Sequence, residues 1–77
     1  MYQIKEQFMD RVNGVWETRR TEEQTVEQSY IDNINGSIKF FRSLGGTETK
    51  RYSNGKTILT STSPDGNSRT IRTWKRV

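Results

Sequence analysis

The most regular stretch of the sequence is residues 21–46, TEEQTVEQSYIDNINGSIKFFRSLGG, which predicts one long amphipathic helix. It opens with Thr21-Glu22-Glu23-Gln24, a pattern typical of a capping box, in which side chains bond the free amides of the first turn. At 100° per residue its large apolar side chains share one half of the helix: Val26, Tyr30, Ile31, Ile34, Ile38, Phe40, Phe41 and Leu44. Gly45-Gly46 predicts a left-handed stop, so the helix is expected over about residues 22–44. Asn35-Gly36 in its middle leaves open a kink or a break into two helices.

The residues after the double glycine predict a three-stranded antiparallel meander. Strands are expected over residues 47–53, 56–63 and 67–76, because Asn54-Gly55 and Pro64-Asp65-Gly66 are turn sequences. The Asn-Gly turn predicts that Tyr52 lies opposite Thr57, and that Lys50 lies opposite Leu59.

The second turn decides which sheet face is covered by the helix. A three-residue loop puts Leu59 opposite Ile71 and assigns Tyr52, Leu59 and Ile71 to the core. A loop of only Asp65-Gly66 shifts the pairing, so that Trp74 joins Tyr52 and Leu59. We expect the three-residue loop.

The first twenty residues are compatible with two different structures. Ile4, Phe8 and Val12 recur every four positions, which favours a short helix over residues 3–12 with Asn13-Gly14 as its cap. The same Asn-Gly pair could instead be the turn of a β-hairpin between residues 8–12 and 15–18. A short strand is expected over residues 15–20 in either case. The predicted fold is therefore α+β in a single domain of residues 1–77: a short N-terminal helix, a short strand, and one long amphipathic helix packed on a three-stranded β-meander.

The composition excludes several classes of chemistry. The 77 residues include no His and no Cys, which excludes serine-histidine triads, thiol nucleophiles, zinc sites built from these residues and disulfides. The carboxylates of Glu22, Glu23 and Glu27 have no pattern that indicates catalysis or a metal site. We expect no enzyme activity, no catalytic residue, no metal and no cofactor. Without an apolar signal segment or membrane span, the cytoplasm is the expected location.

Positive charge is concentrated near the end of the sequence. The chain carries 13 Lys plus Arg and 9 Asp plus Glu, yet residues 1–46 have a net charge of about −1 and residues 47–77 about +5. The adopted register exposes a basic face with one aromatic residue, and its predicted partner-binding residues are Arg51, Lys56, Ile58, Arg72, Trp74 and Arg76. Arg19-Arg20, beside Trp16, would extend this basic surface if their strand pairs with the meander.

Such a face fits an acidic surface on a partner protein, because Trp and Arg are common interface anchors. It also fits nucleic acid, with phosphate contacts from Arg51, Arg69, Arg72, Lys75 and Arg76. In the structural alternative, Trp74 folds into the core and the strands are only solvated. The wide apolar half of the helix further predicts that Ile31 or Phe40 meets the N-terminal helix or a second subunit, and a homodimer through this surface is expected.

Two segments resemble small uncharacterised proteins of tailed bacteriophages. These are FFRSLGGTE (residues 40–48) and STSPDG (residues 61–66) followed by RTIRTW (residues 69–74), and the resemblance spans about residues 21–76. It implies no particular activity or binding residue. It does imply an accessory or regulatory protein that acts by binding a host protein in the host cytoplasm.

Overall fold

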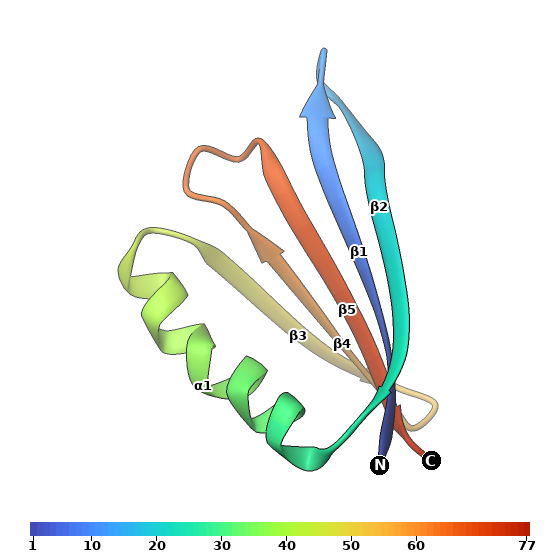
Figure 1. The fold of residues 1–77 in the computed structure, drawn as a ribbon. Helices are drawn as coiled ribbons and strands as arrows, with labels where there is room; N and C mark the ends of the chain where they lie inside the picture. Colours follow the sequence, from blue (N-terminus) through green and yellow to red (C-terminus); the bar gives the residue numbers. More distant parts are fainter.

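The protein consists of one five-stranded antiparallel sheet and one helix. A computed structural model describes residues 1–77, and Figure 1 shows the helix lying across one side of the sheet. The strands and the helix are β1 (Tyr2–Val12), β2 (Val15–Val26), α1 (Gln28–Ser43), β3 (Thr47–Ser53), β4 (Lys56–Thr62) and β5 (Ser68–Arg76). Their order across the sheet is β2-β1-β5-β4-β3, so the first and last strands are neighbours in its centre.

The N-terminal segment is a β-hairpin, so the predicted helix over residues 3–12 is wrong. Asn13 and Gly14 have φ values of 52° and 79°, the left-handed pair that a tight hairpin turn requires. Val12 then pairs with Val15 at the start of the ladder. A spacing of four residues also keeps side chains on one face of a strand, and the turn chemistry therefore decides between the two structures.

The second strand is longer than predicted, and the helix is correspondingly shorter. The segment Thr21–Gln24 does not cap a helix, because it pairs along β1, with Glu23 opposite Lys5. The helix begins after Glu27, whose side chain makes no capping hydrogen bond. The predicted architecture, a short helix, a short strand and one long helix packed on a three-stranded meander, is therefore corrected to a five-stranded sheet with one helix.

The C-terminal end of α1 confirms the predicted glycine stop. Gly45 has φ of +93°, and its N–H donates to the Arg42 carbonyl at 3.0 Å. The Gly46 N–H donates to the Phe41 carbonyl at 3.1 Å, which completes a Schellman motif. The helix runs without interruption through Asn35-Gly36.

The turn between β3 and β4 has the predicted register. Asn54 and Gly55 have φ values of 51° and 75°, and Tyr52 lies opposite Thr57. Lys50 lies opposite Leu59, also as predicted.

The register between β4 and β5 differs by one residue from the adopted prediction. Leu59 lies opposite Arg72 instead of Ile71, and Trp74 joins Tyr52 and Leu59 on one face, as in the alternative pairing. The Ser63 N–H donates to the Ser68 carbonyl at 2.9 Å and closes a loop over residues 64–67.

Asp65 stabilises this loop. Its carboxylate accepts hydrogen bonds from the Ser63 hydroxyl at 2.5 Å and the Asn67 N–H at 2.9 Å. These two hydrogen bonds lower the pKa of Asp65, and the bond from Ser63 has the larger effect.

The core is small and lies on the side of the sheet that α1 covers. Its buried apolar residues are Ile4, Val26, Ile31, Leu59 and Trp74. Of the three residues predicted to face the helix from the sheet, Leu59 is buried, Tyr52 is 74% exposed, and Ile71 lies on the opposite face. Only seven of the 77 residues are buried, because one helix covers one side of the sheet and no helix covers the other.

Candidate functional site

The structure divides the six predicted binding residues between the two faces of the sheet. Because side chains alternate along a strand, Arg51, Lys56 and Ile58 lie on the face without a helix. The other three lie on the face toward α1, here called the helix-side face: Arg72, Trp74 and Arg76. The one-residue change of register causes this division.

Trp74 is part of the core. Its side chain is 4% exposed, and it lies across from Ile4 on β1 and Thr57 on β4. The Lys50 ammonium approaches the indole at 6.0 Å from the ring centre. The structural alternative for Trp74, burial beneath the helix, is therefore the one observed.

Arg72 belongs to a polar network beneath the helix. Its Nε donates to Oε2 of the buried Glu6 at 2.9 Å, and the Tyr30 hydroxyl donates to Oε1 of Glu6 at 2.5 Å. The hydrogen bond to Glu6 is the largest cause of a raised pKa for Tyr30, followed by burial. The network links β1, β5 and α1, and its charged groups balance one another.

The opposite side of the sheet carries a continuous basic surface, here called the open face, which no helix covers. Its basic side chains come from four of the five strands, and one acidic side chain, Glu23, accompanies them. The basic residues are Lys5, Arg11, Arg51, Lys56, Arg69 and Lys75. Lys5 and Glu23 approach each other at 4.0 Å. The positive excess of this face exceeds the net charge of +4 of the whole chain.

The middle of the open face is apolar and rich in threonine. Ile58 and Ile71 are half-buried there, and Thr49 and Thr60 lie beside them in the register of β3 and β4. A shallow hollow of about 290 Å³ lies over this region, lined by Thr49, Arg51, Ile58, Thr60, Arg69 and Ile71. The arrangement is an apolar centre with cations around it.

One end of the open face holds a cluster around Trp16. The Arg69 guanidinium stacks over the Trp16 ring at 4.2 Å from its centre, and Arg11 lies 5.9 Å from the same ring. An Arg69 Nη contacts the Met9 sulfur at 3.6 Å, while its buried Nε has no hydrogen-bond partner. Such cation–π contacts hold an arginine in a fixed position without neutralising its charge.

Sequence reasoning missed the part of this surface that β1 and β2 contribute. Lys5, Gln7, Met9 and Arg11 alternate along the sequence, which is the strand period. The hairpin alternative, with strands over residues 8–12 and 15–18, contained only part of that signal. Arg19-Arg20 do not extend the open face, because Arg20 lies opposite Phe8 on the helix-side face and Arg19 contacts Asp10 at 3.4 Å.

The structure contains few features of other kinds of site. A second hollow of about 310 Å³ lies between α1 and the sheet, lined in part by Phe40, Phe41 and Arg72. No three carboxylates lie close enough together to form a candidate metal site. The helix is too short and too polar to cross a membrane.

Comparison with known proteins gives no further constraint. No protein-family model matches the chain, and no curated protein or solved structure matches it significantly.

Proposed function

We propose that this protein is a non-enzymatic binding protein that binds an acidic partner protein on its open face. The observation that carries the proposal is the basic sheet surface that α1 leaves uncovered. Six cations and one carboxylate share this surface, whereas the helix-side face pairs Arg72 with Glu6 and Arg20 with Glu22. An uncompensated basic surface attracts an acidic one and accelerates its encounter.

The layout of the open face favours a protein over other anionic partners. Protein interfaces combine an apolar centre with a polar rim, and arginine and aromatic residues are their preferred anchors. Ile58 and Ile71 form such a centre, with Arg51 and Lys56 beside them. The stacked pair of Trp16 and Arg69 is an anchor whose position is already fixed before binding.

Nucleic acid is the second candidate, because three of its five predicted phosphate contacts share the open face. These are Arg51, Arg69 and Lys75, whereas Arg72 and Arg76 lie on the helix-side face. A bound base would stack on an exposed aromatic ring. Trp16 is the aromatic residue of this face, and Arg69 already occupies one side of its ring. Because Arg69 leaves only one side of this ring for a base to stack on, we prefer the protein partner.

The resemblance to bacteriophage proteins makes a bacterial host protein the first partner to seek. A small regulator of this kind acts by occupying a surface, and the absence of His and Cys leaves few groups for catalysis. Its site of action would then be the host cytoplasm.

An affinity pull-down from bacterial lysate with a charge-reversed open face tests the proposal. Arg51→Glu with Lys56→Glu replaces two exposed cations on the open face. Lys39→Glu with Arg76→Glu is the matched control, since it changes the net charge equally at exposed positions of α1 and of the helix-side face. We expect one protein captured by the wild type and the control, with affinity for the open-face variant reduced roughly tenfold or more.

Nuclease treatment separates the two candidates. A protein partner should survive nuclease, and its affinity should decline moderately as salt rises. Recovery of nucleic acid alone, with a steep dependence on salt, would replace the protein partner by the second candidate. Equal capture by both charge-reversed variants would reject the open face as the site.

A further inference from the structure

The outer edge of β2 is a long strand edge with no partner. β2 has β1 on one side and nothing on the other, and every residue of β2 from Glu17 to Thr25 is exposed. Unpaired strand edges present N–H and C=O groups to which another strand can add. The β-bulge at Arg19 interrupts this edge, and the regular ladder resumes at Arg20 opposite Phe8.

The charges along this edge have an order that suits pairing with a second copy of itself. The sequence Arg19-Arg20-Thr21-Glu22-Glu23 carries two positive charges before Thr21 and two negative charges after it. In an antiparallel pair centred on Thr21, residues at equal distances on either side of Thr21 lie opposite each other. Arg20 of one copy then lies opposite Glu22 of the other, and the same contact occurs twice.

The existing side-chain geometry supports this arrangement. Arg20 and Glu22 lie on the same face of β2, and the Arg20 Nε already approaches the Glu22 Oε1 at 3.3 Å. The guanidinium also lies over the Phe8 ring at 4.5 Å, which holds it along the hairpin. A second copy would add Glu22 to each Arg20 and complete a ring of four alternating charges.

We infer that two copies of this chain associate through their β2 edges into a continuous ten-stranded antiparallel sheet. The two-fold axis of such a pair passes perpendicular to the sheet, so both open faces lie on the same side. Charges that usually discourage edge pairing here favour one partner and one register. The small core, with seven buried residues, gives added reason for the chain to gain stability by association. This inference does not depend on the proposed function.

Sedimentation velocity over a concentration series tests the dimer with two complementary variants. Arg19→Glu with Arg20→Glu makes the edge segment wholly acidic, and Glu22→Arg with Glu23→Arg makes it wholly basic. Each variant alone should dimerise roughly tenfold more weakly than the wild type, because like charges face each other. An equimolar mixture of the two should recover a dimer, since positions 20 and 22 of the two variants again bring opposite charges together. The control Lys39→Glu with Arg76→Glu should dimerise like the wild type.

Three outcomes would overturn the inference. The first is a wild-type chain that stays monomeric up to millimolar concentration. The second is a variant that dimerises on its own as well as the wild type does. The third is a mixture that remains monomeric although circular dichroism shows both variants folded. The wild type offers a check without substitutions, since the amides around Thr21 should gain hydrogen-exchange protection as concentration rises.

Discussion

Glu6 shows how a single side chain determines the local structure beneath the helix. It is the one charged residue in the buried set, and a carboxylate is buried only where partners compensate it. The Tyr30 hydroxyl and the Arg72 guanidinium supply that compensation from α1 and β5. Arg72 was predicted to contact a partner, and the structure instead uses it to neutralise a charge within the fold.

The raised pKa of Tyr30 predicts a dependence of stability on alkaline pH. The neutral phenol donates to Glu6, so the folded state binds this proton more tightly than the unfolded state, whose pKa is about 10.0. The stabilisation is complete below that value and is lost as pH rises through the higher folded pKa. Urea unfolding as a function of pH should show a steeper alkaline decline for the wild type than for Tyr30→Phe. Parallel curves would contradict the predicted role of the hydrogen bond.

The helix illustrates how much of an element can be predicted from its sequence. The glycine stop and the apolar side were predicted, because Gly45 needs a left-handed conformation and Ile31, Ile34 and Ile38 recur on one side. The start of the helix was not predicted, because the residue types of Thr21–Gln24 fit a helix cap and a strand equally well. Its pairing with β1 is a contact distant in sequence, which local propensity does not contain.

Two glycines of the helix region should respond to alanine in opposite ways. A Cβ on Gly46 would overlap the Phe41 ring, so Gly46→Ala must displace that ring and should cost about 1–3 kcal/mol of unfolding free energy. Gly36 lies within the helix with nothing within 4 Å of an added Cβ, so Gly36→Ala should stabilise by about 0.5–1 kcal/mol. Chemical denaturation of both variants checks the pair, and equal effects would contradict the close approach at Gly46.

At the scale of the whole molecule, one register choice determined how much of the candidate site was predictable. A basic face with Trp74 as its aromatic residue was predicted, yet a shift of one residue exchanges the two faces of β5 and moves Trp74 into the core. Arg51, Lys56 and Ile58 kept their predicted place because the Asn54-Gly55 turn fixes β3 against β4. The contribution of β1 was missed because its pairing with β5 spans almost the whole chain.

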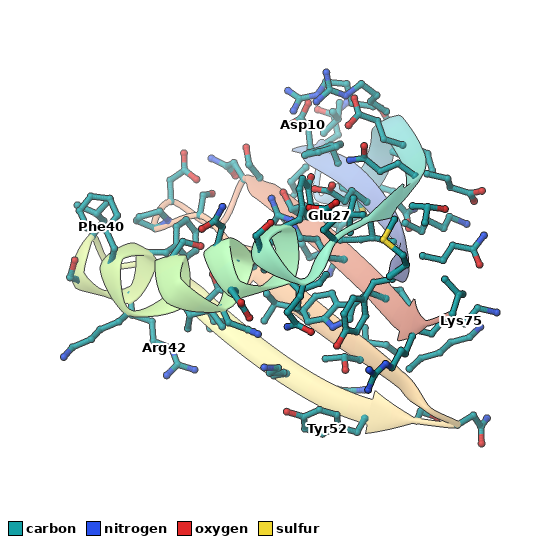
Figure 2. The ribbon with its side chains drawn as sticks, turned by 60° about the horizontal axis from the view of Figure 1, so that its bottom comes forward. Asp10, Glu27, Phe40, Arg42, Tyr52 and Lys75 are labelled. Carbon is teal, nitrogen blue, oxygen red and sulfur yellow. The ribbon has the colours of Figure 1, made fainter.

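Uneven cover across the sheet predicts uneven hydrogen exchange. The far end of the β1–β2 hairpin extends away from α1 (Figure 1), and Val12 and Val15 near its tip are exposed. Figure 2 shows Asp10 near this end of the hairpin, far from Phe40 at the C-terminal end of α1. Amides around Val15 should therefore exchange through local opening, and those of Ile4 and Leu59 only through global unfolding. Uniform exchange rates along β1 would contradict this gradient.

The central pairing of β1 with β5 also has a consequence for biosynthesis. Glu6 and Arg72 are 66 positions apart, and Trp74, which completes the core against Ile4, is translated near the end of this segment. A nascent chain can form the β1–β2 hairpin early, but it has no neighbour for the other edge of β1 until β5 has left the ribosome. Until then that edge is free to pair with other chains, which makes this interval a period of aggregation risk. Closure of the sheet is thus delayed by the order of synthesis, because β1 and β5, which pair with each other, are the first and the last of its strands to be made.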